Sequence, residues 1–322
     1  MHAPKPASFL TSLLIYGGAI SLLGCPDYNV SRIEAGDRYT QGVPERPVDV
    51  LWVIDNSATM TEEQATLLGN FQDFSDVIYQ TSIDFQVGVI TTDAEHGLGL
   101  LTSEVLTADT VDLDEAFTEA VDVGVTGNRE EMPLESILLA TSSEALAAGN
   151  SALFREDADL QIIVLTDEDD QSDGEVQAYL DHLTEFKDAA DYRISLIGGP
   201  LPSGCASTTS SSEPATRLLE AVEATDGLFK SVCEGDFGPV MKSLAFNTTG
   251  MTDTFALSRF PDLSSLEVRV DGVMLHQRPE NGWQYDAAKN SVVLDGLAVP
   301  RPGQTISLVY YEIFGADASS DE

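Results

Sequence analysis

The stretch VDVLWVIDNSATMTEEQ, Val48 to Gln64, decides how the rest of this 322-residue sequence is interpreted. An apolar run ends abruptly at DNSAT, residues 55–59, which places a carboxylate and two hydroxyls at the tip of a predicted buried strand. Such oxygens either close a hydrogen-bonded turn before the next helix or bind a hard metal ion. The stretch alone leaves both interpretations open.

Strand-like and helix-like segments alternate after this stretch. Apolar runs predict strands at residues 48–54, 85–92, 160–166, 192–199 and 227–232, with a short antiparallel edge strand within 101–107. Helical spacing predicts helices at residues 61–79, 132–147, 174–190, 212–225 and 237–248. This alternation is typical of βαβ units. It predicts a doubly wound α/β domain over residues 47–248, with a mostly parallel sheet covered by helices on both faces.

The pattern changes near residue 249. Segments that alternate at period two and are joined by turns continue to residue 314, which predicts a small antiparallel β-sandwich. Trp283 and Tyr285 form either its core or a surface patch, and core is the commoner role of such residues. The acidic residues 315–322 are predicted to be a disordered tail.

Charge excludes one class of partner. The chain has 54 Asp and Glu against 16 Lys and Arg, a formal net charge of -38. Nucleic acid would be repelled by such a surface. Cation binding, saline surroundings and solubility all remain compatible with it.

The N-terminal segment has the features of an export signal. Lys5 precedes an apolar run too short to span a bilayer, and this run ends in LLGC, residues 22–25, which looks like a bacterial lipobox. Residues 1–24 are therefore predicted to be a lipoprotein signal peptide and Cys25 the lipidated residue; an ordinary secretory signal is the alternative. Residues 25–46 are predicted to be a tether, which makes the protein a membrane-anchored lipoprotein of a bacterial cell envelope.

Two further cysteines, Cys205 and Cys233, remain in this exported chain. In an oxidising compartment they are most simply one disulfide, which would stabilise the fold by roughly 3–4 kcal/mol. No histidine near either cysteine indicates a thiol active site.

Oxygen-bearing residues follow three segments of the predicted sheet. Asp55, Ser57 and Thr59 follow the first strand, Thr126 lies in a glycine-flanked loop, and Asp167 follows the strand at 160–166. Ligands of open α/β sheets bind outside the carboxyl ends of the strands. Hard divalent cations take oxygen ligands of this kind.

This combination resembles the metal-ion-dependent adhesion site of von Willebrand factor type A domains. The motif D-x-S-x-T after the first strand, a later loop threonine and LTD at a strand end carry the resemblance, which covers about residues 47–248. VLWVIDNS, VGVITTD and VLTDEDD are similar to bacterial exported members. The family usually has Ser at the position of Thr59. It also has a Gly-Thr pair where this chain reads Gly124, Val125, Thr126.

The resemblance implies roles for these residues. Ser57 and Thr59 would bind a divalent cation through their hydroxyls, and Asp55 and Asp167 would bind it through water. Thr126 would be the fifth ligand. Mg²⁺ is the first candidate, with Ca²⁺ and Mn²⁺ as alternatives, and the open coordination position would accept an Asp or Glu of a protein partner.

Three classes of function remain to be compared. A cation-dependent binding module is the leading hypothesis, and a metal-free scaffold of the cell envelope is the alternative. Metal-assisted hydrolysis is disfavoured because no His or Lys lies beside the motif and no G-x-S-x-G or P-loop is present. The protein is therefore predicted not to be an enzyme.

Two other groups of polar residues have structural explanations at this stage. The acids at 168, 169, 170 and 173 are expected at the N-terminal turn of the following helix, with a second Ca²⁺ site as the less favoured alternative. Thr92 and Asp93 either support the metal site or cap a turn.

Overall fold

The computed structural model describes residues 33–43, 46–81, 83–207, 210–279 and 281–312. The chain divides into two units, residues 1–33 and 34–322, and all the described helices and strands belong to the second. The predicted signal peptide at 1–24, the lipidation site Cys25 and the tail at 315–322 lie outside the described residues. Among the helices of the described ranges, none has both the length and the apolar character that crossing a membrane requires.

A six-stranded sheet in the order β4-β3-β2-β5-β6-β9 forms the centre of the α/β domain. All neighbouring strands are parallel except β4, which pairs antiparallel with β3 at the edge. This confirms the predicted α/β class with a mostly parallel sheet. The strands are β2 (Val48–Ile54), β3 (Phe85–Thr91), β4 (Leu106–Thr107), β5 (Asp159–Leu165), β6 (Tyr192–Gly198) and β9 (Phe229–Ser231).

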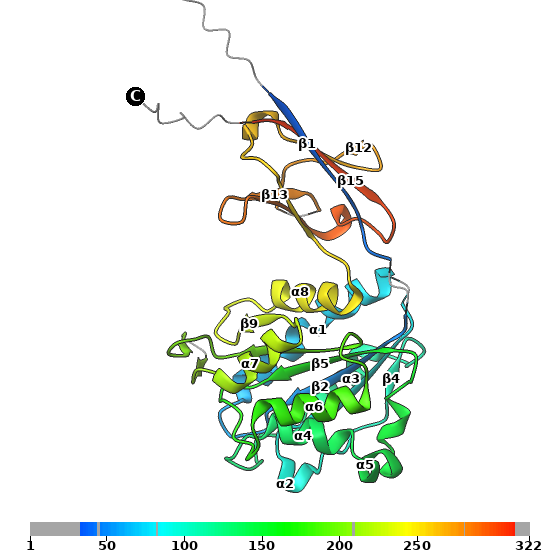
Figure 1. Cartoon of the computed structure of the whole chain (residues 1–322), viewed down its shortest axis with the longest axis vertical. Helices are drawn as coiled ribbons and strands as arrows, with labels where there is room; N and C mark the ends of the chain where they lie inside the picture. Colours follow the sequence, from blue (N-terminus) through cyan, green and yellow to red (C-terminus); the bar gives the residue numbers. More distant parts are fainter. Residues whose placement is uncertain (1–32, 44–45, 82, 208–209, 280, 313–322) are drawn as a thin grey trace, which may run out of the picture. The chain divides into compact units, whose positions relative to one another are not determined.

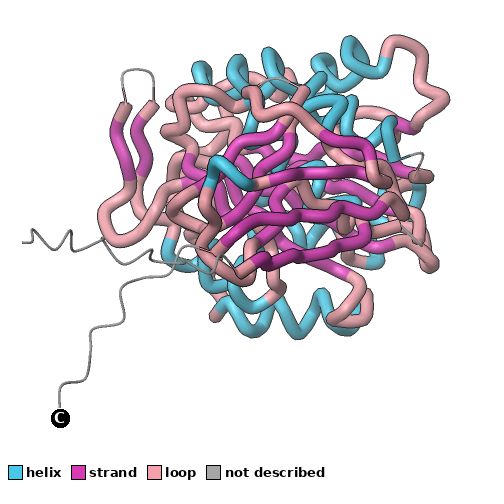
Figure 2. The backbone as a smooth tube through the Cα atoms, turned by 90° about the horizontal axis from the view of Figure 1, so that it is seen from above, coloured by secondary structure: helices cyan, strands magenta, loops and turns pink. Residues whose placement is uncertain are grey.

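Helices cover both faces of this sheet (Figure 1; Figure 2). They are α1 (Thr61–Thr81), α2 (Ala94–Gly97), α3 (Leu113–Val121), α4 (Pro133–Ala140), α5 (Ser143–Ala148), α6 (Val176–Phe186), α7 (Thr216–Ala224) and α8 (Gly238–Thr249), with the short 3-10 helix η1 (Asn150–Ala152). Every residue of β2 is buried. Trp52 packs with α1, α3 and α8, whereas Leu51 and Val53 pack with α4, α6 and α7. A strand buried on both faces explains the unbroken apolar run in the sequence.

One helix prediction was wrong in detail, and helix α3 was missed. The helix predicted at 132–147 is two helices, because the chain turns at Ser142 and the Ser142 hydroxyl accepts a hydrogen bond from the Ala145 amide (3.3 Å) to begin α5. Helix α3 was not predicted because its residues lie in an acidic stretch, although Leu113, Phe117 and Val121 are spaced one turn apart, as on the buried face of a helix.

The β domain consists of two antiparallel sheets around one apolar core. One sheet has the order β1-β15-β11-β12 and the other β10-β14-β13. Trp283 is 4% exposed and belongs to this core, as predicted. The elements are β1 (Glu34–Thr40), β10 (Thr254–Ala256), β11 (Glu267–Val270), β12 (Val273–Met274), β13 (Trp283–Asp286), β14 (Ser291–Leu294) and β15 (Thr305–Tyr311), with 3-10 helices η2 (Leu263–Ser265) and η3 (Gly296–Ala298).

Residues 34–40, predicted as part of a tether, are strand β1 of this domain. All seven residues pair with β15, from Glu34 opposite Tyr311 to Thr40 opposite Thr305. The sequence EAGDRYT conceals the strand because β1 alternates between exposed and half-buried residues and contributes little to the core. The β domain therefore receives chain from both sides of the α/β domain.

The predicted disulfide between Cys205 and Cys233 is present. Cys205 begins a small hairpin of β7 (Cys205–Ala206) and β8 (Ser211–Ser212). The bond fixes this hairpin to the segment that follows β9.

Candidate metal centre

The parallel register places the predicted ligands at one edge of the sheet. Ile54, the last residue of β2, is level with Thr91 of β3 and Leu165 of β5. Asp55 and Asp167 therefore emerge close together, since the three strands end at the same level. The Asp55 amide donates to the Leu165 carbonyl oxygen (3.0 Å), which holds the two loops side by side.

The Asp55 side chain is fully buried and firmly oriented. Its Oδ1 accepts a hydrogen bond from the Ser57 amide (2.7 Å) and its Oδ2 accepts one from the Thr166 hydroxyl (2.6 Å). The Gln64 side chain of α1 donates to the Asp55 carbonyl oxygen (2.8 Å). Asp55 is therefore held by Ser57 after β2, by Thr166 after β5 and by Gln64 of α1.

A chain of oxygens connects the two loops. The Ser57 and Thr59 hydroxyls lie 3.0 Å apart, and the Thr59 hydroxyl donates to Asp167 Oδ1 (3.2 Å). Thr59 therefore joins the same cluster. The structure brings together four predicted site residues: Asp55, Ser57, Thr59 and Asp167.

Thr126 is not part of this series of hydrogen-bonded oxygens. Its side chain is exposed, and within the described ranges no hydrogen bond joins it to the other four residues. Its loop does lie beside them, because the Gly127 amide donates to the Asn56 carbonyl oxygen (2.9 Å) and Gly124 accepts from Gln64 (3.1 Å). The loop is in place, but among the described residues the Thr126 hydroxyl has no hydrogen bond to the other candidate ligands.

Electrostatic repulsion accumulates around Asp55. The pKa of Asp167 is raised to about 7, first by burial and then by the negative charge of Asp55. The pKa of Glu168 is raised for the same two reasons. Burial disfavours the charged form of a carboxyl group, and a neighbouring carboxylate adds to the effect. The cluster is thus a place where positive charge would be stabilised.

Glu131 is a buried acid of this cluster that sequence analysis did not identify. It is fully buried, and burial followed by the charge of Asp55 raises its pKa to about 8. Its Oε2 accepts a hydrogen bond from the Thr92 hydroxyl. Nothing in NREEMP, residues 128–133, tells which of its two glutamates is buried, so the sequence offered no signal for it.

The two residues after β3 have different roles. Thr92 holds Glu131, which connects it to the cluster. Asp93 caps helix α2 by accepting from the His96 amide (3.1 Å), and it also accepts from the Asn128 amide (3.1 Å). Asp93 is therefore a structural residue, with a pKa lowered mainly by these hydrogen bonds against the effect of burial.

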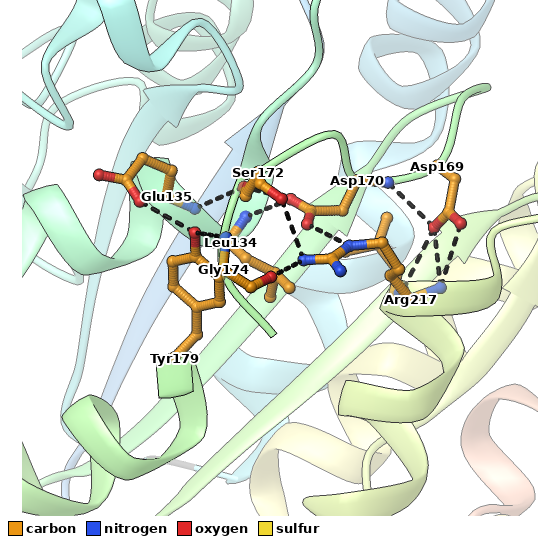
Figure 3. Close-up of polar contacts among 9 residues, drawn as sticks. Leu134, Glu135, Asp169, Asp170, Ser172, Gly174, Tyr179 and Arg217 are labelled. Atoms are coloured by element: carbon orange, nitrogen blue, oxygen red, sulfur yellow. Dashed lines mark hydrogen bonds and ion pairs between the residues drawn. The ribbon is translucent and has the colours of Figure 1, made fainter. Parts of the chain in front are cut away.

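Asp169 and Asp170 belong to a separate, structural network (Figure 3). The sequence predicted both acids at the N-terminal turn of the helix that follows them, which is α6, and that prediction was wrong. Asp169 instead accepts from the Arg217 amide (3.0 Å) at the start of α7, and Asp170 Oδ1 accepts from the Leu134 amide (3.0 Å) at the start of α4. Asp170 Oδ2 also pairs with Arg217 Nε (2.9 Å). These acids cap helices that are distant in sequence.

The donor set around Asp55 fits a hard divalent cation. Within the described residues, no three His, Cys, Asp or Glu side chains are grouped so as to hold a metal ion by themselves. A cation here would need the hydroxyls of Ser57 and Thr59 and water molecules in addition to Asp55 and Asp167. Mg²⁺ in particular retains several waters in protein sites.

The site opens to solvent on one side. A cleft of about 500 Å³ is lined by Thr59, Asp167, Glu62 and Glu63, together with serines of the β7–β8 hairpin. Ala58 also lines it. The cleft therefore gives a partner group access to the Thr59 and Asp167 side of the cluster.

Comparison with known proteins gives likenesses to solved structures only. No family model and no curated protein sequence matches this chain. The open form of the pilus adhesin SpaC from Lactobacillus rhamnosus GG is 11% identical with a TM-score of 0.45, over 89% of this chain and 42% of that one. A von Willebrand factor type A protein from Catenulispora acidiphila is 14% identical with a TM-score of 0.40, over 88% and 66%.

A third structure is proximal thread matrix protein 1 from the mussel byssus with a zinc-occupied MIDAS motif. It is 14% identical with a TM-score of 0.41, over 66% of this chain and 47% of that one. This chain thus spans less than half of the adhesin and of the byssus protein. At such identities and scores these likenesses settle neither the family nor the function of this chain.

Proposed function

We propose that this protein binds a divalent cation between the Asp55–Thr59 loop and Asp167, and that the bound cation holds an acidic side chain of a protein partner. One observation carries the proposal. Asp55, Ser57, Thr59 and Asp167 form one hydrogen-bonded set at the carboxyl edge of the sheet, in which the Ser57 amide donates to Asp55 and the hydroxyls join Ser57, Thr59 and Asp167. The carboxyl groups of this set repel one another.

A cation would relieve that repulsion. Carboxylates in the same site disfavour each other's ionisation, and an opposite charge within a few ångströms reverses the effect. The bound ion would supply a positive centre facing the cleft beside Thr59. A partner carboxylate entering that cleft would complete its coordination. The protein therefore acts as a binding module rather than as an enzyme in this proposal.

Titration calorimetry of the full chain with Mg²⁺, Mn²⁺ and Ca²⁺ tests the cation site directly. We expect one equivalent of cation to bind, with Mg²⁺ as the first candidate. Asp55→Ala should abolish binding because the buried carboxylate is at the centre of the hydrogen-bond network. The matched control is Asp173→Ala, a change of the same kind at an exposed position of the neighbouring loop. Unchanged affinity in Asp55→Ala would contradict the proposal.

The partner is tested by capture on immobilised protein. We expect proteins that are retained in Mg²⁺ to be released by chelator and to be absent from the Asp55→Ala column. Addition of a short peptide rich in Asp and Glu should compete with them. Retention that is the same with and without chelator would show that the partner is held elsewhere.

Location in a bacterial cell envelope by a lipid on Cys25 is part of the same proposal, and it rests on the LLGC sequence alone. Cys25→Ser should move the expressed protein from the membrane fraction to the soluble fraction. The expected loss from the membrane fraction depends on Cys25 only and on neither the β domain nor the net charge.

A metal-free scaffold is the second candidate. The observation in its favour is that Ser57, Thr59 and Asp167 already satisfy one another by hydrogen bonds, and that Thr126 lies outside their network. Absence of any calorimetric signal at millimolar cation would establish this alternative.

A further inference from the structure

One oxygen beside the candidate metal centre has no partner to explain it. Glu131 is fully buried, and its Oε2 accepts from Thr92. Its other oxygen, Oε1, is also buried and has no hydrogen-bond partner among the described residues. A buried acceptor left unsatisfied is costly, and such groups in folded proteins commonly mark a bound water or ion.

The backbone fixes where this oxygen lies. The Met132 amide donates to the Thr92 carbonyl oxygen (3.1 Å), and the Gln171 amide donates to the Glu131 carbonyl oxygen (2.7 Å). Glu131 is therefore held between the loop that follows β3 and the loop that follows β5. Its carboxyl group lies near enough to Asp55 for the Asp55 charge to act on it.

The same loop supplies two residues of opposite character. Thr126 is exposed and is joined to none of the other candidate ligands by a hydrogen bond in the described ranges. Glu131, five positions later, is buried against Asp55. Of the two, only Glu131 has a polar atom next to the centre that still requires a partner.

We propose that Glu131, rather than Thr126, is the residue by which this third loop serves the cation, and that Oε1 of Glu131 accepts a hydrogen bond from a water molecule bound to the ion. This inference rests on the proposed cation site. In the described part of the chain no three acidic side chains are grouped on one metal position, so the proposal gives Glu131 a contact through water rather than a direct one. Hard cations such as Mg²⁺ retain water molecules that need such acceptors.

Glu131 is a positioning residue in this arrangement. A carboxylate that accepts from a metal-bound water fixes that water and adds negative charge near the ion. Loss of such an outer partner typically weakens metal binding by about 10–100-fold.

The experiment compares three variants of the full chain by calorimetry with Mg²⁺ and Ca²⁺. Glu131→Gln preserves the shape and the acceptor for Thr92, and we expect it to weaken cation binding by about 10–100-fold. Glu130→Gln is the matched control, because it makes the same change at the exposed neighbour. Thr126→Ala should bind cation as the unmodified protein does, within about twofold.

A second measurement separates a role toward the cation from a structural role. Thermal unfolding in chelator should show that Glu131→Gln unfolds no earlier than the unmodified protein. Addition of Mg²⁺ should then raise its unfolding temperature less. If Glu131→Gln does not fold, Thr92→Val removes the donor to Oε2 while keeping the charge, and a smaller loss of cation affinity is expected.

The outcomes distinguish this inference from the function on which it rests. Normal cation affinity in Glu131→Gln, with affinity lost in Asp55→Ala, overturns the role of Glu131 and leaves the proposed function standing. Loss of affinity in Thr126→Ala but not in Glu131→Gln assigns the loop ligand to Thr126. No binding by the unmodified protein overturns both proposals.

Discussion

The acidic run DEDD, residues 167–170, contains two pairs of carboxylates in opposite environments. Asp170 has no exposed side-chain surface, but Arg217 and the start of helix α4 neutralise and hydrogen-bond it. Asp167 is 7% exposed, and the charged group that acts on it most is the carboxylate of Asp55. The charge of Asp170 is compensated by the protein itself, whereas the charge of Asp167 is not.

The contrast between Asp170 and Asp167 shows how a buried acid can be assigned a structural or a ligand-binding role. A buried carboxylate needs a compensating charge or hydrogen bonds, or its ionisation is suppressed. Asp170 obtains both from the protein, so its function is to hold α4 and α7 at the end of β5. Asp167 obtains one hydrogen bond, from Thr59, and remains available for a cation.

The largest effect on stability is expected at Asp170, whose charge Arg217 compensates. Asp170→Ala leaves the Arg217 guanidinium without its carboxylate partner and removes the acceptor for the Leu134 amide. We expect a loss of about 3 kcal/mol in the free energy of unfolding, at the lower end of the range for broken buried ion pairs because Arg217 remains 28% exposed. Urea denaturation in chelator measures it. Asp173→Ala should change the stability by less than about 0.5 kcal/mol; an equal loss in both variants would contradict the comparison.

Substitution of Asp167 should have the opposite effect on stability. Asp167→Asn removes one of the repelling charges, so we expect the chelated protein to be as stable as the unmodified protein or more stable. Cation affinity should fall by about 10–100-fold in calorimetry, as for other loss of a carboxylate at a metal site. A variant that is strongly destabilised in chelator would show that Asp167 is as structural as Asp170.

The stability contributed by Asp167 should depend on pH. The pKa of Asp167 in the folded protein, about 7, lies above its ordinary value of 3.8. The folded state therefore holds this proton more tightly than the unfolded state. The stability from this group is fully present below about pH 4 and is lost as the pH rises through about 7. Protons also compete with the cation, so Mg²⁺ affinity should fall by about tenfold between pH 8 and pH 6.

Asp167→Asn is the control for that measurement. Stability curves from pH 4 to pH 8 in chelator should fall less steeply with rising pH in this variant than in the unmodified protein. Superimposable curves would mean that Asp167 ionises normally and that the repulsion with Asp55 is not the source of the effect.

The sequence predicted those parts of the molecule in which local pattern and environment agree. The apolar run ending in Asp55 predicted β2, and LQIIVLTD predicted both β5 and the position of Asp167, because a parallel sheet buries its strands on both faces. Strand β1 was missed since EAGDRYT carries no apolar alternation. Its place is determined by pairing with β15, which lies more than 260 residues later in the chain.

The site was predictable to the extent that its residues follow strands. Asp55, Ser57, Thr59 and Asp167 come directly after β2 and β5, so the register brought them together. Glu131 comes from a loop whose path depends on two long-range backbone hydrogen bonds, to Thr92 and from Gln171. Local sequence does not encode such contacts, and the roles of Asp169 and Asp170 were missed for the same reason.

The smallest effect on stability is expected at Tyr179, which lies beside the hydrogen-bond network of Asp170. The Tyr179 hydroxyl of α6 donates to Glu135 (3.1 Å) and accepts from the Gly174 amide (3.1 Å), next to the Asp170 network (Figure 3). Tyr179→Phe removes both bonds and keeps the ring, so the free energy of unfolding should fall by about 1 kcal/mol. Cation affinity should not change, because these bonds support α4 and α6 rather than the Asp55 cluster. A change in calorimetric affinity would show that the two halves of the loop are coupled, and the assignment of Asp170 as purely structural would then have to include an effect on the metal centre.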